Sequence, residues 1–232
     1  MPFERIFEMP DNIKKAVIFD LDGTLLDTLQ DLTDAVNYLL QTHGFPKRSA
    51  REIRKFLGNG AEELVRLALP EEVAQETLKE YLAEYKAYYN AHSKIKTRPY
   101  DGVMELLEIL KSKGIGTAIV TNKPDLVAGQ LAEEYFGKLI DQTLGDREGI
   151  RRKPDAEPVR WMIERLECHK AIYVGDSEVD ILTARNAGIP CISLTWGFRD
   201  REQLVDCGAA IFADDAEELK RQIFALLEVE DV

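Results

Sequence analysis

The chain has 232 residues, of which 45% are hydrophobic, and its formal net charge at pH 7 is −12. This negative balance argues against binding of nucleic acid or of an anionic membrane surface by bulk electrostatics. Any site for an anionic ligand must therefore be locally positive. The three cysteines are scattered and form no CxxC pair, so we expect neither a disulfide framework nor a zinc knuckle. The length suits one large domain or two small ones.

Residues 1–15 predict no signal peptide, because they are charged and include Pro2 and Pro10. No apolar run approaches the ~18 residues that a membrane span needs. We therefore expect a cytoplasmic protein without a membrane partner, with a loose lead-in over residues 1–12.

The apolar run Ala16-Val17-Ile18-Phe19 predicts a buried parallel strand over Lys15–Asp20. From Thr28 to about Asn90 the hydrophobic spacing is helical instead. The predicted helices are one that ends at Gly44 and Pro46, one over 50–57, one after the turn at 58–60, and one over 71–90. The tyrosines of the last helix stand at helical spacing, and we interpret them as packing residues: Tyr81, Tyr85, Tyr88 and Tyr89.

Beyond residue 102, predicted helices and strands alternate. The strands cover 116–121, 139–143, 171–175, 189–194 and 210–212, and the helices cover 103–113, 124–135, 156–167, 178–187 and the segment from 216. This alternation is typical of an α/β fold, in which a parallel sheet is the middle of three layers. The all-helical block is then an insertion. We expect a core domain over 1–27 and 96–232, and a helical cap domain over 28–95 that can hinge over the site.

Asp20 and Asp22 follow the first predicted strand and are two residues apart. Like charges this close repel each other, so either one carboxyl group takes a proton or a metal ion bridges the pair. The carboxyl ends of strands in an open α/β sheet are also where ligands bind. The pair therefore predicts a catalytic site.

Three further polar groups come at or just after predicted strand ends, and each also has an ordinary local explanation. Thr121 and Asn122 could bind an anionic oxygen, or Thr121 could cap the next helix. Lys153 could face the site or belong to a solvated basic loop. Asp176 and Asp180 share one face of a helix's first turn, and Asp176 could serve as a helix cap.

The order of these groups along the chain favours a single site. Carboxylate oxygens suit a hard divalent cation, and Mg²⁺ typically takes one or two carboxylates together with substrate phosphate and water. Asp20 and Asp176 are the predicted metal ligands, with the backbone carbonyl of Asp22 as a third.

In these motifs the chain resembles the haloacid dehalogenase superfamily of phosphohydrolases. The matching segments are Asp20-Leu21-Asp22-Gly23-Thr24, Thr121, Lys153 and Gly175-Asp176-Ser177-Glu178-Val179-Asp180. The resemblance covers the sheet domain and, more loosely, the helical cap. It implies a Rossmann-like core with a mobile helical lid.

The resemblance also implies a role for each catalytic residue. Asp20 attacks phosphorus and becomes an aspartyl phosphate. Asp22 protonates the leaving oxygen and then activates the water that frees phosphate. Thr121 and Lys153 hold the phosphoryl oxygens.

Two acidic residues complete the implied site. Asp176 binds Mg²⁺, and Asp180 orients Lys153 or the shell of the metal. The dehalogenases of the superfamily lack a carboxylate at the position of Asp22 and need no metal. Because Asp22 and the distal acids are present, we reject dehalogenase activity.

Within the superfamily, Asp22–Thr28 and Arg152–Asp155 most resemble the phosphoglycolate phosphatases. The cap turn Gly58-Asn59-Gly60 resembles theirs as well; its backbone N–H groups could approach a small carboxylate, or it could be an ordinary turn between helices. Those enzymes commonly carry an arginine where this chain has Leu67. Arg66 stands one position earlier, about 100° around the helix, so we expect it to face away from the site.

We therefore expect a Mg²⁺-dependent phosphatase that hydrolyses a small phosphorylated metabolite, with 2-phosphoglycolate as the best candidate. The predicted substrate-binding residues are Thr121, Asn122, Lys153, Gly58, Asn59 and Gly60. An inorganic pyrophosphatase or a β-phosphoglucomutase on the same core is the alternative, and a non-catalytic regulatory binding module is a remote one. The expected assembly is a monomer or a homodimer.

Overall fold

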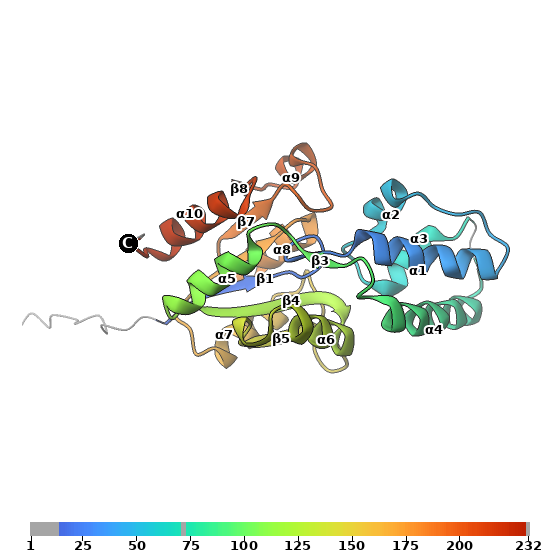
Figure 1. Cartoon of the computed structure of the whole chain (residues 1–232), viewed down its shortest axis with the longest axis horizontal. Coiled ribbons are helices and arrows are strands. Elements are labelled where there is room, and N and C mark those ends of the chain that lie inside the picture. The colour runs from blue at the N-terminus through green and yellow to red at the C-terminus, as the bar shows by residue number, and fades with distance from the viewer. Residues whose placement is uncertain (1–13, 71–72, 231–232) are drawn as a thin grey trace, which may run out of the picture.

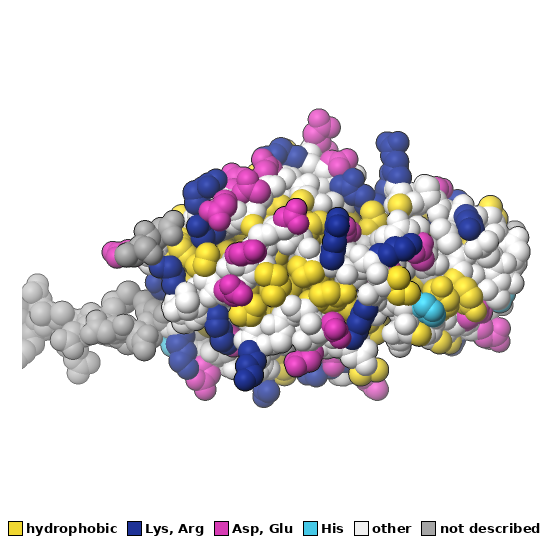
Figure 2. All heavy atoms as spheres, in the orientation of Figure 1, with side chains coloured by type: hydrophobic (Ala, Val, Ile, Leu, Met, Phe, Trp, Pro, Cys, Tyr) yellow, Lys and Arg dark blue, Asp and Glu magenta, His cyan; other side chains and the backbone are white. Residues whose placement is uncertain are grey.

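A computed structural model describes residues 14–70 and 73–230 (Figure 1). The lead-in predicted over 1–12 and the predicted start of the fourth helix at Glu71 lie outside these residues. None of the helices in the described ranges is long and apolar enough to cross a membrane. On the face shown in Figure 2, basic and acidic side chains are interspersed. That face therefore carries no broad basic patch.

A six-stranded parallel sheet forms the centre of the larger part of the molecule, with the strand order β5-β4-β1-β6-β7-β8. The strands are β1 (Lys15–Phe19), β4 (Gly116–Pro124), β5 (Gln142–Asp146), β6 (Lys170–Gly175), β7 (Cys191–Leu194) and β8 (Ile211–Ala213). Val17 of β1 pairs with Thr117 of β4 on one side and with Ile172 of β6 on the other. The ends of β1, β4 and β6 therefore lie side by side.

Helices cover both faces of the sheet, because side chains that alternate along a strand leave one apolar row on each face. Val17 and Phe19 share a core with α5 (Val103–Ser112), α6 (Asp125–Tyr135) and α10 (Ala216–Leu227). Ala16 and Ile18 pack with α7 (Glu157–Arg165) and α8 (Glu178–Ala187). The predicted three-layer α/β core is confirmed.

Four helices between β2 and β3 form the second part of the molecule, and we call them the cap helices. They are α1 (Leu29–Thr42), α2 (Ala50–Phe56), α3 (Ala61–Ala68) and α4 (Gln75–His92). Each packs on its neighbours, and Figure 1 shows them together at one end of the sheet. Buried apolar side chains of these helices, such as Val36 and Leu64, form their shared core.

The two connections to the cap helices run side by side as a small antiparallel ribbon. β2 (Leu26–Asp27) pairs with β3 (Arg98–Pro99). Asp31, which is buried at the start of α1, accepts hydrogen bonds from the N–H groups of Lys96 and Thr97, at 3.0 and 2.9 Å. This carboxylate ties the second connection to the first helix of the cap.

Some predicted element boundaries were wrong. The strand expected at 139–143 begins at Gln142, because 137–139 form a short 3₁₀ helix, η1 (Gly137–Leu139). Helix α9 (Arg201–Asp206) was not predicted. Among the tyrosines of α4, Tyr88 stacks on Tyr38 at 3.9 Å between ring centroids, as packing requires. Tyr85 and Tyr89 are buried, but they also line the cavity described below.

Candidate active site

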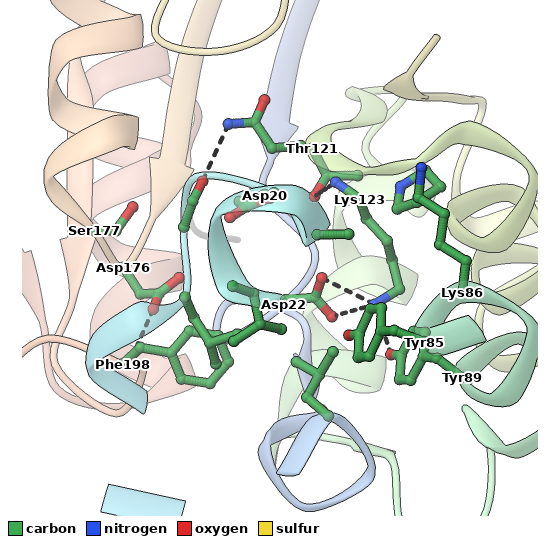
Figure 3. A pocket seen from close by; sticks show the side chains of 18 of the residues that line it. Asp20, Asp22, Tyr85, Lys86, Tyr89, Thr121, Lys123, Asp176, Ser177 and Phe198 are labelled. Carbon is green, nitrogen blue, oxygen red and sulfur yellow. Dashed lines mark hydrogen bonds and ion pairs between the residues drawn. The ribbon is translucent and has the colours of Figure 1, made fainter. Parts of the chain in front are cut away.

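Four of the predicted site side chains come together at the carboxyl ends of three neighbouring strands (Figure 3). Asp20 follows β1, Thr121 lies near the end of β4, and Asp176 follows β6. Together with Asp22 they line a cavity of about 60 Å³ between the sheet and the cap helices. Adjacency of β4, β1 and β6 in the sheet is what brings them together.

Lys153 lies in the loop between β5 and α7, and its ammonium group is 3.0 Å from Asp20 Oδ1 and 2.8 Å from Asp180 Oδ1. It also donates to the hydroxyl of Tyr173, which donates to the carbonyl of Val120. Burial disfavours the ammonium, but Asp180 and Asp20 outweigh burial and raise the pKa of Lys153 well above its ordinary value. Lys153 is therefore a buried cation beside Asp20 and not part of a solvated loop.

Asp176 does not cap helix α8. Its Oδ1 accepts from the hydroxyl of Thr24 at 2.9 Å, and its Oδ2 accepts from the N–H of Phe198 at 2.7 Å. The start of α8 is satisfied by Asp180, whose Oδ2 accepts from the N–H and the hydroxyl of Ser177 at 3.0 and 2.7 Å. The two donors fix the carboxylate of Asp176 beside the cavity.

Thr121 is not a helix cap either, because β4 continues to Pro124 and α6 begins only at Asp125. The neighbouring Asn122 has a structural role. Its amide donates to the carbonyls of Gly58 and Lys153, both at 3.1 Å, and so joins the cap turn to the lysine loop. Its role in substrate binding stays a prediction.

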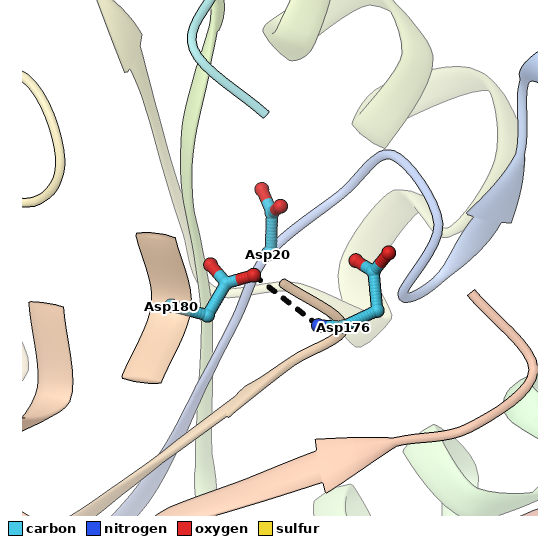
Figure 4. A group of neighbouring side chains, drawn as sticks. All are labelled: Asp20, Asp176 and Asp180. Atoms are coloured by element: carbon cyan, nitrogen blue, oxygen red, sulfur yellow. Dashed lines mark hydrogen bonds between the residues drawn. The ribbon is translucent and has the colours of Figure 1, made fainter. Parts of the chain in front are cut away.

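The carboxylates of Asp20, Asp176 and Asp180 form a buried cluster, with one oxygen from each within 4.8 Å of the others (Figure 4). Among the described residues, Asp20 Oδ1 has no hydrogen-bond partner apart from its ion pair with Lys153. Burial, opposed by Lys153 and reinforced by Asp180 and Asp22, raises the pKa of Asp20 to about 6. The single ammonium group of Lys153 therefore does not balance the negative charge of the three carboxylates.

A metal cation fits this deficit. Burial, Asp180 and Asp20 raise the pKa of Asp176 well above its ordinary value. A divalent cation between the carboxylates would stabilise their ionised forms. Because Lys153 and the start of α8 already engage both oxygens of Asp180, Asp20 and Asp176 are the side chains best placed to hold the ion.

Asp22 is turned toward a lysine that was not predicted as a site residue (Figure 3). The ammonium of Lys123 lies 2.8 and 3.0 Å from the two carboxylate oxygens of Asp22, and it donates to the hydroxyl of Tyr89 in α4 at 2.7 Å. The only local signal is the spacing of Lys123 from Thr121, since residues two apart point to the same side of a strand.

The cap turn Gly58-Asn59-Gly60 only partly faces the cavity. Gly58 and Gly60 line it, whereas Asn59 lines a neighbouring open groove. Both glycines have positive φ, +113° and +86°, which side chains disfavour. Arg199, also not predicted, donates to the carbonyl of Leu57 at 2.8 Å and so holds the start of this turn against the core.

Comparison with known families identifies the chain. Residues 17–194 match the family described as haloacid dehalogenase-like hydrolase. The chain belongs to this family. This agrees with the predicted superfamily.

Similar proteins of this hydrolase family carry one name repeatedly. The chain is 33% identical over 214 residues to phosphoglycolate phosphatase 1 of Pseudomonas aeruginosa, covering 89% of this chain and 79% of that one. It is 34% identical over 220 residues to a phosphoglycolate phosphatase of Agrobacterium fabrum, covering 90% and 92%. A crystal structure from Lactobacillus delbrueckii, assigned provisionally to the same enzymes, superposes with a TM-score of 0.85 at 36% identity and covers 91% and 99% of the two chains.

Arg66 of this hydrolase lies outside the cavity, as its position on the helix predicted. It donates to Glu63 across one turn of α3 at 2.8 Å. Its side chain lines the open groove that also contains Asn59. Arg66 is therefore not placed to bind a ligand beside Asp20.

Proposed function

We propose that this hydrolase is a Mg²⁺-dependent phosphatase that hydrolyses a small phosphate monoester, with 2-phosphoglycolate as its substrate. The observation that carries the reaction class is the buried carboxylate of Asp20, held between Lys153 and Asp176 at a small cavity. The names of its relatives support the substrate.

In the first half of the reaction, Asp20 attacks phosphorus and the bond to the leaving oxygen breaks. Asp22 gives its proton to that oxygen, and Asp20 is left as an aspartyl phosphate. Lys153 and Thr121 bind the phosphoryl oxygens. Repulsion between unit charges ~4 Å apart is about 4 kcal/mol at an effective dielectric of about 20, so the attack of one anion on another needs these donors.

In the second half, Asp22 takes a proton from water, and the resulting hydroxide attacks phosphorus. The bond between Asp20 and phosphorus breaks, which releases inorganic phosphate and restores both carboxyl groups. General acid–base catalysis of this kind contributes about 10²–10⁴-fold in rate.

Asp20 and Asp176 would hold the Mg²⁺ ion, with the backbone carbonyl of Asp22 as the predicted third protein ligand. When bound, the ion neutralises charge on the phosphoryl oxygens and on the carboxylates. Asp180 positions Lys153, because its Oδ1 is 2.8 Å from the ammonium group of that lysine.

The size of the cavity favours a small leaving group. Its volume of about 60 Å³ is shared between the phosphoryl site and the leaving group, and one water molecule already needs ~10–15 Å³ on this measure. Apolar side chains close it on the cap side, among them Leu64 and Tyr85. A short leaving group such as glycolate fits this volume.

The cap helices are proposed to open and close over the site. We divide the chain into a core of 1–27 and 96–232 and a cap of 28–95, since the only two connections run together as the β2–β3 ribbon in the described structure. The cap turn and α4 both contribute to the cavity. Substrate entry then requires the cap to move.

Phosphate release from a panel of esters tests this function. The panel contains 2-phosphoglycolate, glycerol phosphates, sugar phosphates and pyrophosphate, each with Mg²⁺. We expect 2-phosphoglycolate to lead by at least tenfold in kcat/KM, about 1.4 kcal/mol of transition-state discrimination. EDTA should abolish turnover, and added Mg²⁺ should restore it.

The other results of this panel test the substrate, the reaction class and the enzymatic activity separately. If another monoester leads, the substrate is wrong while the reaction class stands. A lead by pyrophosphate contradicts monoester hydrolysis. Silence across the whole panel with Mg²⁺ present contradicts the enzyme and favours a binding module.

Gly197→Ala is expected to weaken metal binding about 10–100-fold, as loss of the support around a metal ligand does. An added Cβ at Gly197 would collide with the carboxylate of Asp176 and displace it. The measurement is the Mg²⁺ concentration that gives half-maximal turnover. Gly129→Ala is the matched control, because a Cβ at that glycine of α6 meets nothing within 4 Å. Equal Mg²⁺ dependence in both variants would contradict the role of Asp176.

A further inference from the structure

Lys123 is a buried lysine next to the reacting groups, and the half-reactions above give it no role. Its side chain is 2% exposed at the end of β4. In the described part of the chain only Lys153 is a comparably buried lysine. A buried ammonium group is unfavourable unless its charge is paired and its donors are used, so its contacts should reveal its function.

The two buried lysines pair with different carboxylates. Lys153 contacts Asp20 and Asp180, and so serves the nucleophile. Lys123 contacts both oxygens of Asp22, at 2.8 and 3.0 Å. A carboxylate held at both oxygens has little freedom to rotate. Lys123 therefore fixes the orientation of Asp22, the residue to which the proposed reaction assigns proton transfer.

The third polar contact of Lys123 comes from the cap. It donates to the hydroxyl of Tyr89 in α4 at 2.7 Å, and its ammonium lies 4.6 Å from the centre of that ring. Tyr89 in turn stacks with Tyr85 at 5.9 Å, and both rings are buried. The chain of contacts from Asp22 through Lys123 thus ends in the packed interior of the cap helices.

We propose that Lys123 is a positioning residue for the proposed phosphatase reaction. Lys123 holds the Asp22 carboxyl group in the orientation needed for proton transfer and connects it to α4 through Tyr89. Asp22 is then in place for proton transfer when α4 lies over the sheet. This inference rests on the proposed function, because it assigns Asp22 the proton transfers given there. Misplacement of a reacting group by about 1 Å can cost about 10²-fold in rate.

Lys123→Met tests this role, since methionine keeps an apolar stem and removes the ammonium.

Two esters separate phosphorylation of Asp20 from hydrolysis of the aspartyl phosphate. The leaving group of 4-nitrophenyl phosphate departs without a proton, whereas an alkyl phosphate needs the proton of Asp22. With the nitrophenyl ester we expect a rapid first release of about one equivalent per active site, followed by a steady state about 100-fold below wild type. With the alkyl ester the first release should also slow about 100-fold, with KM changed by less than about threefold.

Three further variants sharpen the result. Tyr89→Phe keeps the ring and loses one hydrogen bond to a charged group, so the same steps should slow by about tenfold. Lys123→Arg keeps the charge and should recover part of the loss. Lys94→Met is the control, because Lys94 pairs with Glu134 of α6 at 2.8 Å, away from the cavity. It should keep wild-type rates for both esters.

A readout without turnover is the urea midpoint of unfolding. Lys123→Met and Asp22→Asn each break the same buried pair, so each should lower the midpoint partly for the same reason. The midpoint of the double variant should therefore lie well above the value obtained by adding the two single shifts. Additive midpoints, or equal losses with both esters and in both steps, would show that Lys123 only supports the fold and would overturn the inference. If wild type hydrolyses no phosphoester, the proposed function fails, while the midpoints still decide whether Lys123 holds Asp22.

Discussion

Asp20→Asn is expected to abolish turnover and the first release of leaving group. An amide cannot attack phosphorus as a carboxylate does, so no aspartyl phosphate forms. The measurement is phosphate release from the best ester of the panel, together with a rapid-mixing assay for the first turnover. Residual turnover above roughly a hundredth of the wild-type rate would contradict the assignment of Asp20 as nucleophile.

The same variant should fold as well as wild type or better. Burial raises the pKa of Asp20 to about 6, against the opposing effect of Lys153, which shows that its buried charge is unfavourable. The amide removes that charge at nearly constant shape. The urea midpoint at neutral pH should therefore be unchanged or higher. Asp206→Asn on α9 is a matched control, since Asp206 is exposed and should keep wild-type turnover.

Asp22→Asn is expected to let the phosphorylated enzyme persist. The amide can neither give a proton to the leaving oxygen nor take one from water, so turnover should fall about 10²–10⁴-fold. With 4-nitrophenyl phosphate, phosphorylation still proceeds and the aspartyl phosphate accumulates. Acid quenching followed by mass spectrometry of the peptide that contains Asp20 measures it.

Two results would count against this role of Asp22. One is release of nitrophenolate with no phosphate trapped on Asp20. The other is a turnover rate close to that of wild type. A lower urea midpoint is expected in this variant, because an amide replaces the carboxyl group that pairs with the ammonium of Lys123, and that ammonium stays buried.

The sheet core could be predicted from local patterns because each of its elements carries its own signal. The run of Ala16 to Phe19 is apolar on both sides of the strand, as a central parallel strand requires, and β1 is central. The helical spacing of Leu32, Val36 and Leu39 likewise marks the buried face of α1. The start of β5 was misplaced, because apolar residues at 139–140 look the same in a 3₁₀ turn and in a strand.

Three polar groups of the candidate site were found from the sequence for a topological reason. Parallel strands end at one edge, so polar residues after successive strands must meet there. That rule reaches Asp20, Thr121 and Asp176. It could not choose between a capping and a catalytic role for Asp176, which depends on the N–H of Phe198, far along the chain.

Lys123 and Arg199 mark what only the tertiary structure decided. Each carries a charge that a sequence pattern assigns to solvent by default, and each is buried against partners that include a residue of the cap. Lys123 meets Asp22 and Tyr89, and Arg199 meets the carbonyl of Leu57. The sequence by itself determined which residues follow the strands at the carboxyl edge of the sheet, because the hydrophobic period that marks each strand and its end is a local property. Which charges are buried against the cap depended on how the side chains of the cap helices meet those of the sheet, and no local pattern records that.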